Sequence, residues 1–183
     1  MIESYLGVHP TYDKTNFVAD SAVLIGDVRL GRNASIWYNA TVRGDVNWIR
    51  IGEASNVQDN AVVHVTHDTA PTLIGNHVTI GHSAVVHGCT IEDSVLIGIG
   101  AIVLDHAVIG TGSLVGAGAL VTGGTEIPPR SLVVGSPARV ARQLTEDEVR
   151  GVHQNALNYV RYRAIVLGEE TPAQNPFYRP RGD

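Results

Sequence analysis

Aliphatic side chains recur along most of this chain at intervals of six residues. The series starts at Val18, passes through Leu24 and Val42 and, after interruptions, continues as far as Ile127. A period of six matches neither the 3.6-residue period of a helix nor the alternation of a single strand. It fits a short strand followed by a tight corner, with the aliphatic side chain pointing inward at each repeat. Small residues, mostly alanine, often follow four positions later, where backbones crowd at the corner.

This repeat predicts a prism of stacked β-coils. Three repeats complete a coil of about 18 residues, and successive coils stack at the strand spacing of about 4.8 Å. The repeating region would then form roughly six coils. Residues 1–17 show no clear period, and we interpret them as a lead-in that starts or caps the prism. The alternative is a globular sheet protein with coincidental spacing, and the number of repeats argues against it.

A different pattern follows the repeat, which weakens at Pro128. Thr145 and Glu148 have the spacing of a capping box, a hydroxyl followed by a glutamate three residues later. Apolar residues after this point recur at helical spacing. We therefore predict a helix over residues 146–167 that ends near Gly168.

Composition narrows the class of protein. With 44% hydrophobic and 17% charged residues, the 183-residue chain can bury a core. A net charge of −5 and a pI near 5.9 argue against binding to nucleic acid or anionic membranes. No apolar run approaches the roughly 18 residues of a membrane span, and the N-terminus lacks the basic and apolar segments of a secretion signal. The single Cys89 fits a reducing compartment, so we expect a cytoplasmic protein.

The spacing of two histidines in the repeat predicts that their side chains lie next to each other. His64 and His87 are 23 residues apart, which is one 18-residue coil plus five. The polar, proline-containing segment 66–73 interrupts the repeat, and a loop there would supply the extra five residues. His64 and His87 would then occupy matching positions on adjacent coils, with backbones about 5 Å apart. Two imidazoles in this arrangement can bind one metal ion.

A third histidine, His82, is expected to complete such a site only from another chain. It precedes His87 by five residues with a corner between them, so it lies on or near the previous face. A neighbour packed around a three-fold axis could bring its own His82 to the pair on this chain. Three histidines with an open fourth position form a catalytic type of metal site. The alternative is a set of unrelated surface histidines. No partner at ligand spacing is found for His9, His77, His106 and His153.

An ordered set of polar motifs accompanies these histidines. The set consists of Arg43-Gly44-Asp45, Asn56-Val57-Gln58-Asp59, His64 and His82-Ser83-Ala84-Val85-Val86-His87-Gly88. Together with the repeat, it resembles the gamma-class carbonic anhydrases, and the resemblance covers residues 1–167. The hexapeptide repeat alone is shared with many acyltransferases, whereas the ordered set is far more specific.

The resemblance implies an all-β fold, a left-handed parallel β-helix of hexapeptide repeats with a C-terminal α-helix. The expected organisation is a left-handed β-helix domain over residues 1–140, a C-terminal helical segment over 141–168 and an extended tail over 169–183.

The resemblance also implies a homotrimer with metal sites at the subunit interfaces. The implied metal is Zn²⁺ or Fe²⁺, held by His64 and His87 of one chain and by His82 of another. The implied activity is that of a carbonate dehydratase, a lyase that hydrates carbon dioxide reversibly with a metal-bound hydroxide. Carbon dioxide and bicarbonate would be the small-molecule substrates, and no nucleic-acid or membrane partner is expected.

Several further residues match positions with roles in the family. Gln58 matches the residue that orients the metal-bound solvent by hydrogen bonding, and Asn56 matches a nearby polar position. Arg43 and Asp59 look like an ion pair across the interface, with Asp45 in the same network. A solvated surface pair is the alternative for Arg43 and Asp45. No separate cofactor-binding residues are expected.

The sequence departs from the best-studied active members at the proton relay. In those members, the residue after the aspartate of the Arg-x-Asp motif is a glutamate, whereas this chain has Val46. The loop after His64 contains only two ionisable residues, His67 and Asp68. Hydration requires a proton to leave bound water, so a lost relay slows turnover. His67 could substitute, and Tyr159 matches a tyrosine used by short-loop members. A solvated loop residue and a helix-packing aromatic are the respective alternatives.

Two other functions are compatible with the sequence. One is a hexapeptide acyltransferase or coenzyme A thioester hydrolase, and the exit sequence Gly135-Ser136-Pro137-Ala138 fits it. The other is a trimer that binds metal without catalysis. Saturable coenzyme A binding would favour the first, and a metal-loaded protein inert toward carbon dioxide and thioesters would favour the second.

Overall fold

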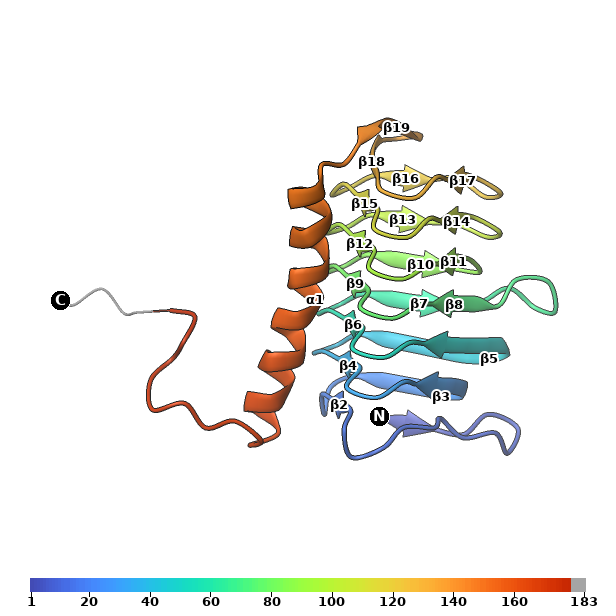
Figure 1. Cartoon of the computed structure of the whole chain (residues 1–183). Helices are drawn as coiled ribbons and strands as arrows, with labels where there is room; N and C mark the ends of the chain where they lie inside the picture. The colour runs from blue at the N-terminus through green and yellow to red at the C-terminus, as the bar shows by residue number, and fades with distance from the viewer. Residues whose placement is uncertain (179–183) are drawn as a thin grey trace.

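The computed structural model describes residues 1–178, which form a stack of β-coils with one long helix along its side (Figure 1). About seven turns of short strands wind around one axis, which confirms the predicted left-handed parallel β-helix with a C-terminal α-helix. The stack has about one turn more than the repeat predicted, because the lead-in adds strand β1 (Ile2–Glu3), paired with β3 (Val23–Leu30).

The strands lie on three faces. On the first face, β1 and the beginnings of β3 and β5 (Thr41–Ile51) are followed by β7 (Val62–His64), β10 (Val85–His87), β13 (Ile102–Val103) and β16 (Leu120–Val121). On the second face, the ends of β3 and β5 are followed by β8 (Thr72–Ile74), β11 (Thr90–Ile91), β14 (Val108–Ile109) and β17 (Glu126–Ile127). The third face contains β2 (Phe17–Val18), β4 (Ser35–Ile36), β6 (Asn56–Val57), β9 (Thr79–Ile80), β12 (Leu96–Ile97), β15 (Leu114–Val115), β18 (Ser131–Gly135) and the antiparallel β19 (Ala138–Gln143).

Strand β5 explains the interruption of the repeat near Trp48. It continues across a corner for 11 residues, pairing with β7 at its start and with β8 at its end. Its pairing with β3 shifts register between Gly26 and Val28. The extra residues of β5 therefore lengthen this corner. The six-residue spacing of inward positions starts again at Ile51, which is buried.

The inward aliphatic positions form the core, as the period predicts. All are buried except Val18 and Leu30, which lie in the first coils, where the lead-in gives only partial cover. At most corners one residue has a positive φ, and it lies three positions after the inward aliphatic. Glycine, asparagine and histidine adopt this conformation more readily than most residues. Examples of this corner position are Asn33, Asn39, Asn60, His77, Gly100, His106, Gly112 and Gly124.

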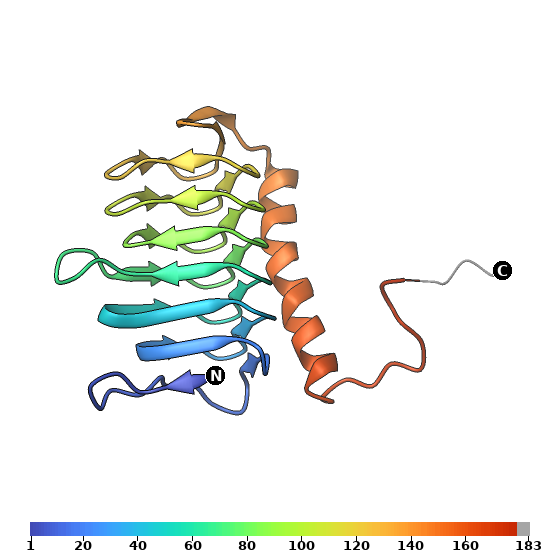
Figure 2. The same ribbon diagram turned by 180° about the vertical axis from the view of Figure 1, so that it is seen from behind.

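The helix α1 (Glu146–Val166) begins at Thr145, whose side chain and that of Glu148 form the predicted capping box. It runs back along the third face from the last coils to the first (Figures 1 and 2). Tyr159 packs edge-on against Trp37, with ring centroids 5.5 Å apart. The buried Arg163 donates a 2.6 Å hydrogen bond to the Thr15 carbonyl, so the second half of α1 is fixed to the coils and their lead-in.

The tail expected over residues 169–183 has no helix or strand as far as residue 178, and residues 179–183 lie outside the described part. Phe177 packs against Tyr162 of α1, with ring centroids 4.6 Å apart. No helix formed by residues 1–178 has the apolar length needed to cross a bilayer.

Candidate metal centre

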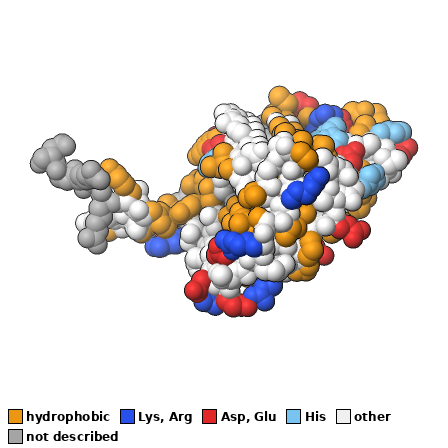
Figure 3. All heavy atoms as spheres, turned by 90° about the horizontal axis from the view of Figure 1, so that it is seen from above, with side chains coloured by type: hydrophobic (Ala, Val, Ile, Leu, Met, Phe, Trp, Pro, Cys, Tyr) orange, Lys and Arg blue, Asp and Glu red, His pale blue; other side chains and the backbone are white. Residues whose placement is uncertain are grey.

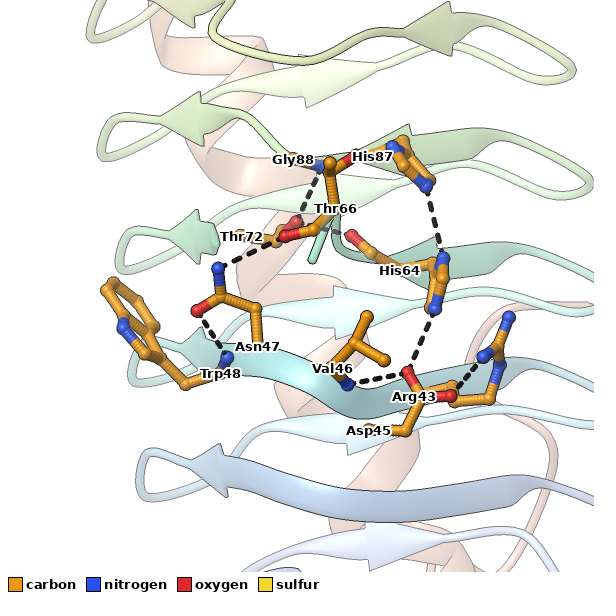
Figure 4. A network of polar contacts seen from close by, with 10 residues as sticks. All are labelled: Arg43, Asp45, Val46, Asn47, Trp48, His64, Thr66, Thr72, His87 and Gly88. Atoms are coloured by element: carbon orange, nitrogen blue, oxygen red, sulfur yellow. Dashed lines mark hydrogen bonds and ion pairs between the residues drawn. The ribbon is translucent and has the colours of Figure 1, made fainter. Parts of the chain in front are cut away.

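His64 and His87 end the neighbouring strands β7 and β10, and the two residues are paired in register. This confirms the stacking predicted from their spacing. The extra residues form a loop after β7 that protrudes from the stack (Figure 1), closed by a bridge between Thr66 and Ala70. His64 Nδ1 lies 3.0 Å from His87 Nε2 (Figure 4). A single chain therefore brings two imidazole nitrogens within 3.0 Å of each other.

The second nitrogen of each ring contacts a carboxylate. His64 Nε2 lies 3.1 Å from Asp45 Oδ1, and Asp45 also accepts hydrogen bonds from Arg43 and from the Val46 backbone N–H (Figure 4). His87 Nδ1 lies 2.5 Å from Oδ1 of Asp105. Asp45 was singled out from the sequence, whereas Asp105 was not, because it lies in a regular stretch of the repeat with no motif around it.

Electrostatics at this edge favour a neutral imidazole beside ionised carboxylates. Burial is the largest cause that lowers the pKa of His64, and the nearby positive charge of Arg43 adds to it. The hydrogen bond to Asp45 raises this pKa but does not cancel the effect of burial. Burial alone would raise the pKa of Asp45, but hydrogen bonds from His64 and Arg43 hold it below its ordinary value. A neutral imidazole keeps a lone pair, which a metal ligand requires.

The third predicted ligand lies at another corner of the same face. His82 is in the turn between β9 and β10, and its Nδ1 lies 2.9 Å from Asp59 Oδ2. Each of the three histidines thus has its own aspartate. Among residues 1–178, no three histidine, cysteine, aspartate or glutamate side chains converge into a metal-binding group. Within this chain, Arg43 contacts Asp45, and Asp59 contacts His82. The Arg43–Asp59 ion pair was expected between two chains and remains a prediction.

Gln58 and Asn56 belong to a buried chain of hydrogen bonds that reaches the helix. Gln58 Nε2 donates to Asn56 Oδ1 (3.2 Å), and Asn56 Nδ2 donates to the Thr79 hydroxyl (3.0 Å). The Thr79 hydroxyl in turn donates to Asn155 Oδ1 on α1 (3.1 Å). The involvement of Thr79 and Asn155 was not evident from the sequence, because they are 76 residues apart.

A groove of about 290 Å³ lies beside this chain of hydrogen bonds, and Gln58, His82 and Tyr159 line it. Burial, with smaller effects of Asp59 and Tyr162, raises the pKa of Tyr159 to about 12. Its hydroxyl therefore stays protonated at neutral pH. The ring also packs on Trp37 and Tyr162, so the structure supports a packing role for Tyr159 as well as a place near the groove.

The paired imidazoles suit a metal ion of the zinc or ferrous class, for which imidazole is a preferred ligand. Two nitrogens bound to one tetrahedral zinc at about 2.0–2.1 Å lie roughly 3.3 Å apart, so the observed 3.0 Å requires little movement. Carboxylates that hold the outer ring nitrogens are the usual companions of metal-binding histidines. Cys89 is buried, and burial raises the pKa of its thiol to about 12, so it is a small core residue rather than a candidate ligand.

Two other histidines meet, contrary to the expectation that they have no partner. The rings of His77, at a corner of the stack, and His153, on α1, lie 4.7 Å apart between centroids. His153 Nδ1 also contacts the Ser94 hydroxyl at 3.1 Å. This pair could not be predicted from the sequence, because it depends on how α1 packs against the coils.

Seen along the stack, histidine and acidic side chains lie together at the surface of the prism on the side away from the tail (Figure 3).

Comparison with known proteins places these features in a family. A family model described as bacterial transferase hexapeptide (six repeats) matches residues 88–123. A probable carbonic anhydrase of Methanocaldococcus jannaschii is 58% identical over 144 residues, covering 79% of this chain and 90% of that protein. The mitochondrial gamma carbonic anhydrase 1 of Arabidopsis thaliana is 50% identical over 155 residues, which are 82% of this chain but only 56% of the plant protein.

A solved structure agrees with these relatives. A hexapeptide transferase family protein from Anaplasma phagocytophilum has a TM-score of 0.85 to this chain at 44% identity, and the match covers 88% of this chain and 95% of that one. Each of these three matches covers at least 79% of this chain, far more than the segment 88–123 matched by the family model. The chain therefore belongs to the gamma carbonic anhydrase family of hexapeptide-repeat proteins.

Proposed function

We propose that this protein hydrates carbon dioxide reversibly as a homotrimer whose metal sites are each shared by two subunits. The observation that carries the proposal is the in-register pair of imidazoles, whose facing nitrogens lie 3.0 Å apart. His82 lies at another corner, where its side chain is 42% exposed, and it would bind the metal ion of a neighbouring subunit. A bound Zn²⁺ or Fe²⁺ would supply the Lewis acidity that lets water lose a proton near neutral pH.

Gln58 is suited to orient solvent at the site because its neighbours fix which way its amide faces. The Val78 carbonyl can only accept, and Asn56 Nδ2 lies 3.4 Å from it. Asn56 therefore turns its oxygen to Gln58 Nε2, and Gln58 Oε1 accepts no hydrogen bond from residues 1–178. This oxygen would hold a hydrogen of the reacting solvent and aim its lone pair at carbon dioxide.

The remaining predicted residues would act at the interface and in proton transfer. Arg43 would bridge to Asp59 of the partner subunit, while Asp45 keeps His64 in place. Tyr159, with a pKa of about 12, is poorly matched to a proton relay at neutral pH and would instead donate a hydrogen bond. His67 is about three-quarters exposed on the loop, where it could exchange protons with buffer in place of the glutamate that Val46 replaces.

The direct test compares metal content and carbon dioxide hydration in the wild type with those in His64→Ala and His87→Ala. We expect the wild type to bind zinc and hydrate carbon dioxide, and both variants to lose both properties while remaining trimeric. His9→Ala, in the exposed lead-in, is the matched control and should behave as the wild type. Full hydration activity in His64→Ala would overturn the proposal.

Mixing variants tests whether the site is shared. His82→Ala and His87→Ala chains each lack one ligand, but a mixed trimer contains one interface where His64 and His87 of the first chain face the partner subunit's His82. We therefore expect co-refolding of the two inactive variants to restore part of the activity. If both variants fold as trimers and their mixed trimers stay inactive, the shared site is wrong.

A second candidate is acyl transfer, which the names of the hexapeptide family model and of the Anaplasma protein favour. Coenzyme A titration of the metal-loaded protein separates the two. Saturable binding without hydration activity would favour an acyltransferase or thioester hydrolase, and a metal-loaded protein inert in both assays would favour a trimer that binds metal without catalysis.

A further inference from the structure

The His87 ring is held from behind by a carboxylate outside every motif singled out in the sequence. Asp105 Oδ1 lies 2.5 Å from His87 Nδ1, while His87 Nε2 faces His64. An ionised carboxylate can only accept a hydrogen bond, so the ring proton must lie on Nδ1. The lone pair of His87 is then on Nε2, the nitrogen that faces the neighbouring imidazole.

The protruding loop holds the other oxygen of this carboxylate. The Thr66 hydroxyl donates to Asp105 Oδ2 at 2.5 Å, although the two residues are 39 apart in sequence. Thr66 is itself fixed, because its N–H donates to the Ala70 carbonyl at 2.9 Å and its carbonyl accepts from Asn47 Nδ2 at 3.1 Å. The loop therefore starts at the coil of His64 and reaches past the coil of His87 to the next one.

The corner after His87 is shaped to admit Asp105. Gly88 has a φ of +57°, and a Cβ built on it would lie 2.5 Å from Asp105 Oδ1 and 2.8 Å from the Ala70 Cβ. Any side chain at this position would push the carboxylate away from the ring or the loop away from the corner. The inward aliphatics Val86 and Ile91 are separated here by five residues instead of six, so the repeat itself is altered at this point.

We propose that Asp105, secured by Thr66 and accommodated by Gly88, is a positioning residue that fixes His87 in the Nδ1-protonated form and presents its Nε2 for metal binding. The inference rests on the proposed metal site. Asp45 has the corresponding place behind His64, so each imidazole of the pair would be oriented by its own aspartate. Loss of such a partner typically weakens metal affinity 10–100-fold.

The test uses the full-length protein and measures zinc affinity by competition with a chelator. We expect Asp105→Asn to bind zinc roughly 10–100-fold more weakly, Thr66→Val to lose less, and Thr66→Ser to restore the wild-type affinity. Asp93→Asn is the matched control, because Asp93 also lies two residues after an inward aliphatic but, among the side chains of residues 1–178, has hydrogen bonds only with Asn76. It should bind zinc as the wild type does.

A second measurement does not depend on metal. Nitrogen-15 NMR of the metal-free protein reports which nitrogen of His87 carries the proton, and we expect Nδ1 in the wild type and a shift toward Nε2 in Asp105→Asn. If the wild type binds no zinc but the His87 proton moves from Nδ1 toward Nε2 in Asp105→Asn, the proposed function fails and the role of Asp105 in fixing the tautomer stands. If Asp105→Asn keeps both the tautomer and the zinc affinity of a metal-binding wild type, the role of Asp105 is wrong.

Discussion

The coils on either side of Gly88 follow the same repeat but differ in regularity. From Ile91 to Ile127 every inward aliphatic is followed by the next after six residues. Between Val42 and Ile91 the repeat is broken by the long strand β5, by the loop after β7 and by the shortened corner at Gly88. Each break serves the candidate site: β5 carries Asp45, the loop carries Thr66, and the corner admits Asp105.

The third face shows the same contrast. One column of in-register positions on it runs from Ser35 through Asn56 and Thr79 before Gly88, then changes to leucine at Leu96 and Leu114 in the regular coils after it. The polar half connects α1 with Gln58, whereas the leucine half has no hydrogen-bonding side chain. The regular repeats supply the frame, and the departures from the repeat position the polar groups.

The largest effect is expected from a core deletion in the regular coils. Ile97 is fully buried, so Ile97→Ala should lower the free energy of unfolding by about 2–5 kcal/mol through lost burial and a cavity. Ile99, two residues away and 59% exposed, provides the control, since Ile99→Ala should change it by less than about 0.5 kcal/mol. Urea denaturation of both variants measures the difference, and equal costs would contradict the view of these coils as the frame.

A smaller effect is expected in the polar column of the interrupted coils. Asn155→Ala removes the acceptor of the buried Thr79 hydroxyl, and an unsatisfied buried group costs about 1–3 kcal/mol. Gln154→Ala changes an exposed neighbour on α1 and should have little effect. Urea denaturation again measures the cost, and an unchanged unfolding free energy in Asn155→Ala would show that the column does not couple α1 to the coils.

The smallest effect concerns the start of α1, outside both sets of coils. Hydrogen bonds from Arg142 and the Thr145 backbone lower the pKa of Glu148 to about 2. Because the folded pKa is depressed, the stabilisation is complete above the unfolded value of about 4.5 and is lost as the pH falls toward 2. Unfolding of Glu148→Gln should therefore be less sensitive to pH between these values than unfolding of the wild type, with Glu126→Gln as an exposed control. Identical pH profiles would contradict this.

The coiled frame and the pairing of His64 with His87 could both be predicted from residue spacing alone. The six-residue period places each inward side chain, and the 23-residue separation of His64 and His87 places them in register once a loop is removed. The capping box likewise located the start of α1. These features could be predicted because the backbone repeats, so position along the chain translates directly into position in space.

Which side chains meet across the coils and the helix could not be predicted from spacing, because it depends on the path of the chain in three dimensions. Asp105 reaches His87 and Thr66 because one corner is shortened and one loop folds back, and neither path can be read from the period. The contact of His77 with His153 depends on the packing of α1 against the third face. A repeat fixes where backbones lie, but side chains from different coils meet according to the lengths of the corners, the paths of the loops and the elements packed outside the coil.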